Sequence, residues 1–460
     1  MSSSQAQADY ASPDFSSGCA AGETGGAKGG AMLLHGVGRF LTGFAIALIA
    51  FPAFAQTEAP TAKEDSVGSR ARPDYDPLGI ESRDLLTSMG LAADPFTGSF
   101  LIFPKADVGF VYDDNIYRIE TDERSDKILR FSPGVRIQSD WDNHLLTLRA
   151  GANIGRYQDN GSEDYEDFNF GGSGVVDLTE RTSVGGGISF AKSHTDRASP
   201  DDSGQGIPLT DTFQTTYRLN AAFKGERFSF RTDGEWTVLD FDDAGPINND
   251  DQDRDEYRFS FRVGYEFLRG TTLFVQPSYK LVEYDQSLDD GGRQRSSDGY
   301  RLLSGLEWDI SGVTFLKIGA GFLEQKFDDV LFGTVSGPAF TVDFVWNATD
   351  LMTFTLELDR TVEETTLVNA SGILNTKWSF AVDYDPLENL IFTLGGSMKN
   401  EDYEGVTREE DTLRFHFIVK YLIHPEWVTE FRYQYEDRDS NEIGESYKDN
   451  RWLAQFTFRL

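Results

Sequence analysis

The chain has 460 residues, with 76 acidic and 42 basic side chains and a formal net charge of -34. Its mean hydropathy of -0.41 excludes a membrane protein with several apolar helical spans, and its acidity excludes a nucleic-acid binder that works through a basic surface. One cysteine gives no basis for a disulfide scaffold, and 13% aromatic residues are too many for a disordered acidic chain.

The N-terminal region carries an export signal. Residues 40–51 form an apolar run of secretory h-region length, and Arg39 precedes it. Residues 53–55 give the small-x-small pattern of a cleavage site, so we expect the mature chain to begin at Gln56. The run is too short to span a bilayer comfortably as an anchor. Met32 lies just before this signal and is the expected start of translation.

A Pro-, Ala- and Asp-rich segment follows the signal. After it, apolar and polar residues alternate along the chain with a period of two. In residues 257–267, Tyr, Phe and Val alternate with Arg, Ser, Gly and Glu, and residues 413–421 and 451–460 repeat the pattern. The expected organisation is a signal peptide over 1–55, a periplasmic leader over 56–98 and an outer-membrane β-barrel over 99–460. Whether the leader plugs the barrel is left open.

The connections distinguish a barrel from a soluble sandwich, because short turns alternate with long acidic loops. A transmembrane barrel has this asymmetry between its periplasmic and extracellular rims, and a sandwich has no reason for it. The pattern predicts an all-β, antiparallel, up-and-down transmembrane barrel of about eighteen strands. Short turns are expected at 140–144, 177–182, 224–227, 268–271, 309–312, 347–350, 385–389 and 423–426. Long extracellular loops are expected at 113–126, 157–163, 192–211, 240–255, 284–298, 325–336, 361–374, 400–411 and 436–449.

Three segments near the start of the barrel resemble a known family. They are residues 70–80, residues 100–104 and the stretch YDDNIYR at 112–118. Together they resemble a family of outer-membrane β-barrel porins associated with exopolysaccharide synthesis and export in Gram-negative bacteria. The resemblance implies an outer-membrane channel and a role in passing surface polysaccharide, with periplasmic export components as partners. It brings no catalytic residues.

The polar face of the strands is the candidate functional surface. Basic residues outnumber acidic ones there although the chain is acidic overall, which favours a pore that prefers anions. The alternative is that these groups form ion-pair ladders with carboxylates on neighbouring strands, and the two interpretations are compatible. The pore-lining candidates are Arg130, Arg136, Arg149, Arg218, Arg231, Arg258, Arg262, Arg301, Lys317, Lys377, Arg414, Lys420, Arg432 and Arg451.

No residue pattern indicates an enzyme or a cofactor. No Ser, His and acid cluster stands out, and no P-loop, Rossmann or zinc spacing is present. The acidic loop at 248–256 is dense in the oxygen ligands that Ca²⁺ prefers, but it lacks the glycine of an EF-hand, so divalent-cation binding is left open.

The sequence therefore predicts a channel in the bacterial outer membrane, with exopolysaccharide export as one use. The alternatives are a general diffusion porin without a dedicated partner and a structural or adhesive barrel with a closed pore. The expected partners are outer-membrane lipid and lipopolysaccharide, the barrel-assembly machinery and, for the exporter, periplasmic polysaccharide-export components, with no nucleic acid.

Overall fold

The structure, a computed structural model, describes residues 100–460 with the exceptions of 142, 143 and 203, so the predicted signal peptide and leader lie outside the described residues. Eighteen strands follow one another along the chain. They are β1 (Phe100–Asp113), β2 (Asp126–Ser139), β3 (His144–Tyr157), β4 (Tyr165–Thr179), β5 (Thr182–His194), β6 (Asp211–Lys224), β7 (Phe228–Phe241), β8 (Arg254–Leu268), β9 (Thr271–Tyr284), β10 (Ser297–Asp309), β11 (Thr314–Phe327), β12 (Val335–Thr349), β13 (Met352–Glu363), β14 (Gly372–Leu387), β15 (Leu390–Glu404), β16 (Glu409–His424), β17 (Trp427–Ser440) and β18 (Tyr447–Arg459).

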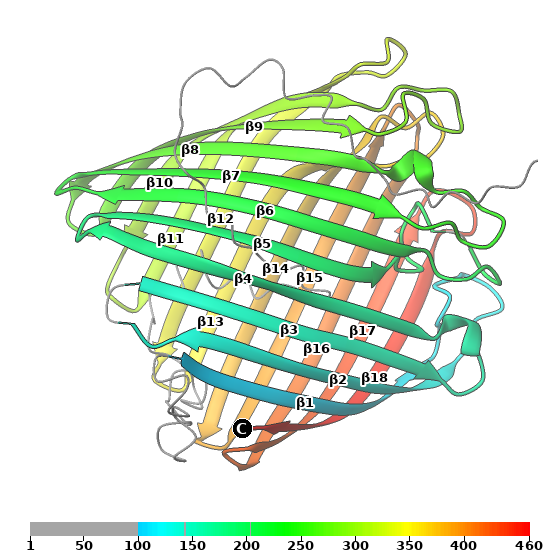
Figure 1. The fold of residues 1–460 in the computed structure, drawn as a ribbon, viewed down its shortest axis with the longest axis horizontal. Coiled ribbons are helices and arrows are strands. Elements are labelled where there is room, and N and C mark those ends of the chain that lie inside the picture. The colour runs from blue at the N-terminus through cyan, green and yellow to red at the C-terminus, as the bar shows by residue number, and fades with distance from the viewer. Residues whose placement is uncertain (1–99, 142–143, 203) are drawn as a thin grey trace, which may run out of the picture. The chain divides into compact units, whose positions relative to one another are not determined.

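These strands form one closed antiparallel sheet (Figure 1). Each strand pairs with its neighbours in the sequence, and β1 also pairs with β18. At this seam Ala106 lies opposite Phe458 and Tyr112 lies opposite Trp452. The predicted closure of the first strand on the last is therefore confirmed, and no edge strand is left among the described strands.

The period of two separates an outer face from an inner one. Large apolar side chains such as Phe110, Phe170 and Phe259 are 66%, 56% and 55% exposed. The residue three positions before Phe110, Asp107, is on the other face and only 7% exposed. Aromatic residues that face outward on every side of a sheet need lipid to cover them, which is the pattern of a transmembrane barrel.

The connections alternate in length as predicted. The short ones contain two to four residues, and the long ones gather at the other end of the barrel (Figure 1). Several strands nevertheless run further than the sequence indicated: β15 ends at Glu404 and β16 begins at Glu409, so the expected loop at 400–411 contains four residues. The predicted loop at 436–449 is likewise shortened to residues 441–446. Backbone pairing continues into water without apolar side chains, so the apolar alternation marks only the lipid-facing part of a strand.

Two three-residue 3-10 turns, η1 (Gly161–Glu163) and η2 (Asp250–Gln252), lie in the long loops. Within the described part of the chain, no helix is long and apolar enough to cross a membrane.

The inner face also carries an apolar cluster that the sequence analysis did not predict. Phe274 of β9 is 3% exposed, and its ring lies over Gly305 and Gly319 on the two next strands. A Cβ built at these glycines would come within 2.8 and 3.1 Å of the ring, so larger residues would displace it. The buried members of the cluster are Phe274, Leu303, Leu323, Val335, Ala339 and Leu374.

Candidate functional site in the barrel lumen

Ion pairs that reach over intervening strands identify the concave side of the wall. Arg262 of β8 lies 2.7 Å from Glu307 of β10, and Arg301 of β10 lies 2.8 Å from Asp359 of β13. Side chains converge on the inside of a closed sheet and diverge on the outside. These side chains therefore point into the lumen, and the opposite face presents the exposed aromatic residues.

Most of the predicted pore-lining residues are in ion pairs with carboxylates on the same face. Arg218 lies 2.5 Å from Glu235, and Lys317 lies 2.6 Å from Asp343. The full set of these pairs joins Arg218 and Arg258 to Glu235, Arg258 also to Glu256, Arg231 to Asp233, Arg262 to Glu307, Arg301 to Asp359, Lys317 to Asp343, Arg414 to Glu436, Lys420 and Arg432 to Glu430, and Arg451 to Asp113 and Asp449. The ladder interpretation thus describes much of the wall, while ion selectivity stays a prediction.

The other candidates have different neighbours. Arg130 donates a hydrogen bond of 2.7 Å to the side-chain oxygen of Gln455, and the Arg136 guanidinium lies 4.5 Å from the centroid of the Phe103 ring. Arg149 lies directly opposite Arg136 in the β2–β3 register, and Lys377 lies directly opposite Lys399 in the β14–β15 register.

The charge on one wall is uneven along the barrel. Between β16 and β3, through the seam, the described inner face near the short turns carries Lys105, Arg136, Arg149, Lys420, Arg432 and Arg459. The described carboxylates there are Asp107 and Glu430 on the strands and Glu426 in the β16–β17 turn, next to Arg459. Nearer the long loops, carboxylates and guanidiniums occur in balanced pairs, as Arg414 with Glu436 shows at 2.9 Å. The excess of positive charge therefore lies toward the end with the short turns, which is the periplasmic end in barrels of this kind.

The YDDNIYR stretch fastens the seam at the opposite end. Arg118, in the β1–β2 loop, lies 2.6 Å from Asp449 of β18, and Asp113 lies 2.7 Å from Arg451 of β18. Asn115 donates a hydrogen bond of 2.9 Å to the carbonyl of Lys448. The motif therefore ties the first strand and its loop to the last strand, and we call this group of residues the seam clasp.

Two guanidiniums offset most of the negative charge of the clasp carboxylates. Asp113, Asp114 and Asp449 are the described residues whose carboxylate oxygens converge closely enough to suggest a cation. Burial alone would lower the pKa of Arg118, but Asp449 and Asp113 more than offset this effect, so its pKa is raised and its positive charge is secure. With Arg451 alongside, two guanidiniums offset two of the three carboxylates.

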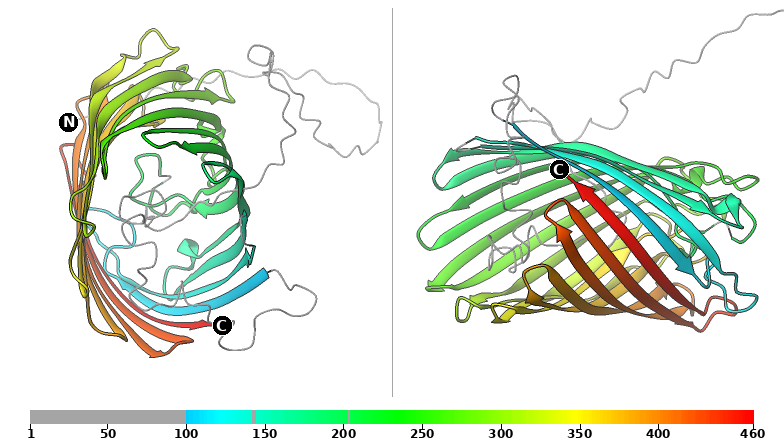
Figure 2. Two further views of the ribbon diagram at one scale, coloured as in Figure 1. Left: turned by 90° about the vertical axis from the view of Figure 1, so that its left-hand side faces the viewer. Right: turned by 90° about the horizontal axis from the view of Figure 1, so that it is seen from below.

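Long loops meet over the lumen. Asp201 lies in the loop that joins β5 to β6, and its carboxylate accepts hydrogen bonds from both Thr365 and Thr366 in the loop that joins β13 to β14. These bonds are 3.0 to 3.1 Å long. The two loops start about half-way round the sheet from one another, so their contact crosses the mouth of the barrel. In the view along the barrel, teal and green loop segments lie inside the ring of strands (Figure 2, left).

Two buried arginines hold these loops in place. Arg295, in the β9–β10 loop, is 3% exposed and donates to the carbonyls of residues 365, 366, 367 and 370. Arg197, in the β5–β6 loop, makes two 2.9 Å bonds to Glu163 and also contacts Asp202. We call the joined β5–β6 and β13–β14 loops, with these two arginines, the mouth bridge. Sequence reasoning missed it because loops have no periodicity that indicates their partners.

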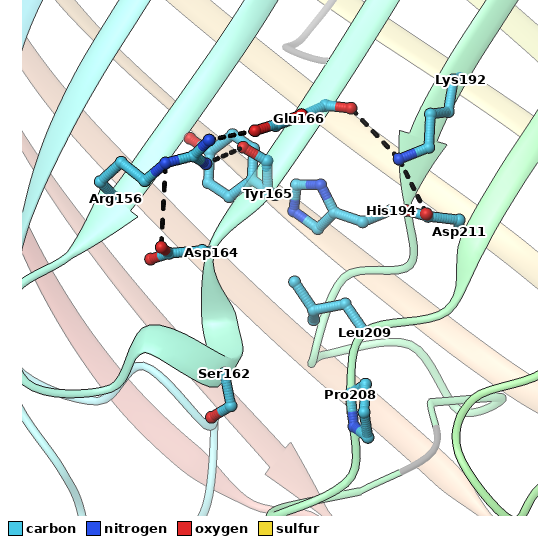
Figure 3. Close-up of a pocket in the computed structure, with 10 residues that line it drawn as sticks. All are labelled: Arg156, Ser162, Asp164, Tyr165, Glu166, Lys192, His194, Pro208, Leu209 and Asp211. Carbon is cyan, nitrogen blue, oxygen red and sulfur yellow. Dashed lines mark hydrogen bonds and ion pairs between the residues drawn. The ribbon is translucent and has the colours of Figure 1, made fainter.

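A cavity of about 460 Å³ lies at the loop end between β3 and β6 (Figure 3). Its charged groups already pair: Lys192 lies 2.7 Å from Asp211, and Arg156 contacts Glu166. The His194 ring lies 4.4 Å from the Tyr165 ring at a tilt of 31°, and its Nδ1 is hydrogen-bonded to Asp167 at 2.9 Å, which is the histidine–acid half of a triad. The cavity's serine, Ser162, is drawn well away from His194, and no hydroxyl bonds that ring among the described residues (Figure 3).

A closed barrel with a lipid-facing aromatic surface and a charged lumen is a channel-forming protein of the outer membrane. The chain belongs to the Putative beta-barrel porin 2 family, whose model matches residues 95–460. This membership makes the protein an outer-membrane porin rather than an enzyme.

Solved structures of similar architecture come from Pseudomonas aeruginosa. OccK5 (OpdH) is 11% identical with a TM-score of 0.42, and the match covers 79% of this chain and 98% of that one. OccK2 (OpdF) in complex with glucuronate is 11% identical with a TM-score of 0.44, covering 78% and 98%. OpdK with vanillate is 10% identical with a TM-score of 0.42, covering 78% and 99%. No curated protein matches the sequence.

Proposed function

We propose that this porin is an anion-preferring channel for acidic saccharides and that it serves the export of surface polysaccharide. The observation that carries the proposal is the excess of basic groups on the lumen wall between β16 and β3, toward the periplasmic end. A positive wall with low-dielectric surroundings concentrates anions at the entrance and raises their rate of entry. A polyanion that arrives from the periplasm would meet this wall first.

As an exporter the channel would receive its polymer from a periplasmic partner. Residues 70–80 precede the barrel and are the candidate contact for such a partner. A general diffusion porin would need no partner and would pass small solutes of either charge. Selectivity for acidic over neutral saccharides therefore separates the two forms of the channel.

The mouth bridge favours a second candidate, a structural barrel with a closed pore. The Asp201 carboxylate joins loops from nearly opposite sides of the sheet, and such a contact narrows the extracellular mouth. If the bridge closed the pore permanently, the barrel would conduct nothing. A bridge that opens would instead make the mouth a point of control over flux.

Flux from proteoliposomes tests these functions. Vesicles with the purified full chain would be loaded with tetragalacturonate or neutral maltotetraose, and release would be followed over time. We expect faster release of tetragalacturonate and a smaller preference in the Lys420→Gln/Arg432→Gln double variant, because each change removes a positive charge from the wall between β16 and β3. Equal release of both saccharides would indicate a general porin. No release from the parent or from a variant with the bridge broken would leave only the structural barrel.

A further inference from the structure

A carboxylate from a long loop is bound on the inner wall of the barrel. Glu364 is the first residue after β13, and its side chain is only 3% exposed. Its Oε1 accepts a hydrogen bond of 2.7 Å from Nζ of Lys280 on β9 and another of 2.7 Å from Nε2 of Gln325 on β11. Strands β10, β11 and β12 lie between β9 and β13 in the sheet. The loop that joins β13 to β14 therefore bends inward and lies across this part of the wall.

The wall offers this carboxylate a prepared site. Lys280 and Gln325 each lie directly opposite Gly299 of β10. The glycine has no side chain to stand between them, so one carboxylate reaches both donors. The Gln325 amide also donates a hydrogen bond of 2.9 Å to Ser297, which fixes the direction of the amide. Because an ammonium group and an amide N–H suit any carboxylate, the site does not depend on a glutamate of this chain.

Glu364 also balances the charge of Lys280. It is the ion-pair partner that the described residues give this lysine. Arg258 lies directly opposite Lys280 in the β8–β9 register. The nearby Glu256 already contacts two arginines, Arg254 at 3.1 Å and Arg258 at 2.8 Å. If Glu364 left the wall, Lys280 would lose its ion pair, and a carboxylate from the lumen would restore it.

Movement of Glu364 must reach the mouth bridge, because the next residue along the chain belongs to it. The Thr365 hydroxyl donates a hydrogen bond of 3.1 Å to Asp201 in the β5–β6 loop. The Thr365 carbonyl accepts a hydrogen bond from Arg295 in the β9–β10 loop. The β13–β14 loop is thus held at the wall and at the mouth by adjoining residues, so release at the wall loosens the bridge.

We propose that Lys280, Gly299 and Gln325 form a carboxylate-binding site on the lumen wall, which Glu364 occupies until the carboxylate of an acidic saccharide displaces it. The saccharide thereby loosens the mouth bridge that restricts its own passage. The site rests on the proposed function in that it lies in the lumen through which acidic saccharides would pass. A solute shifts the loop in this way because it takes the site only when Glu364 has left, so it binds the released state and not the closed one.

Fluorescence anisotropy of labelled tetragalacturonate tests the site in the full chain in detergent, without any need for flux. Glu364→Gln should tighten binding about tenfold, the gain expected where an internal competitor leaves the site free about a tenth of the time. Adding Lys280→Gln to this variant should remove the gain. The matched control is Asp343→Asn, which frees Lys317 from a 2.6 Å ion pair between adjacent strands and detaches no loop. We expect the control to bind as the parent does.

A probe on the loop reports its release directly. Val368, in the β13–β14 loop, is 65% exposed, so Val368→Cys in a Cys19→Ser background takes a nitroxide label without displacing a buried group. Tetragalacturonate should make this label more mobile in the parent barrel, and neutral maltotetraose should not. With Glu364→Gln added, the label should be mobile before any saccharide is present. Circular dichroism checks that each variant keeps its strand content.

The outcomes for the site are separate from those for the channel. Equal gains in Glu364→Gln and Asp343→Asn would show a general effect of charge and would overturn the proposal. Binding that Glu364→Gln leaves unchanged, or a label that does not respond while tetragalacturonate is bound, would overturn it as well. Tighter binding by Glu364→Gln in a barrel that passes acidic and neutral saccharides equally would instead refute the proposed function and leave the site intact.

Discussion

The guanidinium of Arg118 lies 2.6 Å from the carboxylate of Asp449, and both side chains are almost completely buried. The two residues belong to opposite ends of the barrel sequence, and the ion pair lies where the sheet closes on itself. Arg118 also has φ of 55°, a conformation that non-glycine residues seldom adopt. The contacts of the clasp thus hold a residue in an unfavourable backbone state.

Breaking this pair should destabilise the closed seam. Arg118→Gln leaves Asp113 and Asp449 as neighbouring buried carboxylates, and the loss of one partner of a buried ion pair costs about 3–5 kcal/mol. We expect the variant to unfold at lower denaturant concentration than the parent in lipid vesicles. The control is Arg181→Gln, whose exposed contact with Glu226 is long, at 4.0 Å, and should contribute little. Identical unfolding midpoints for Arg118→Gln and the parent would contradict a stabilising clasp.

The mouth bridge should control conductance. Asp201→Ala removes the acceptor of three hydrogen bonds between the β5–β6 and β13–β14 loops, so the loops should separate more often and the mean open conductance should rise. Glu442→Ala is the control, because Glu442 is an exposed acid of the β17–β18 loop and lies outside the bridge.

Cross-linking the β5–β6 and β13–β14 loops should have the opposite effect to breaking the bridge. The sequence contains a single cysteine, Cys19, in the predicted signal region, so Asp201→Cys with Thr365→Cys introduces one reactive pair in the barrel. A short bifunctional maleimide should hold the two loops together in this double variant and lower its conductance. The same reagent should leave the conductance of each single variant unchanged. If neither the cross-link nor Asp201→Ala changes the conductance, the bridge does not lie on the conducting path.

The outward aromatic face should tolerate no charge. Phe259, in the middle of β8, is 55% exposed on the face assigned to lipid, while Ser260 faces the lumen. Arginine on the lipid face near the membrane centre costs about 2–4 kcal/mol, whereas a lumen position keeps its water. Phe259→Arg should therefore reduce the yield of folded protein in vesicles much more than Ser260→Arg. A greater loss of folded protein for Ser260→Arg than for Phe259→Arg would show that the lipid and lumen faces have been assigned wrongly.

The β7–β8 loop should respond to pH through Asp253. Burial, together with the nearby carboxylates of residues 240, 250 and 285, raises the pKa of Asp253 to about 6, although a hydrogen bond from the Phe241 amide partly opposes this shift. Because the folded loop binds this proton more tightly than the unfolded chain does, the loop gains stability as pH falls through about 6 and loses it as pH rises.

Asp253→Asn mimics the protonated form and keeps an oxygen acceptor for Phe241. At pH 7.5 the variant should slow hydrogen exchange in the loop relative to the parent, after correction for intrinsic rates. At pH 5 the two proteins should exchange alike. A difference that persists at pH 5 would mean that the carboxyl group does not titrate in this range.

The barrel itself could be predicted from the sequence because the period of two is a strong and repeated signal. The outward position of Phe259 and the pairing of β1 with β18 both follow from alternation and from the need to close a sheet in lipid. Phe274 shows the limit of this signal, since an apolar residue on the polar face breaks the pattern and depends on glycines of neighbouring strands.

The parts that could not be predicted are contacts between distant segments. Asp201 and Thr366 are far apart in the sequence, and neither position has a residue type that indicates its partner. The YDDNIYR stretch was recognisable as a motif, but its role depends on Asp449 and Arg451, which only the closed register brings beside it. Lys105 and Arg459 likewise become neighbours only through the seam.

The reversal potential of single channels in a planar bilayer tests the central claim, a channel with a positive lumen wall, most directly. Under a tenfold KCl gradient, the purified full chain should conduct, and the sign of its reversal potential should be the one expected for a channel that prefers chloride over potassium. Lys420→Gln with Arg432→Gln should move this potential toward zero, because each change removes a positive charge from the wall between β16 and β3. A potassium preference in the parent, or a barrel that stays silent even with Asp201→Ala, would contradict the account.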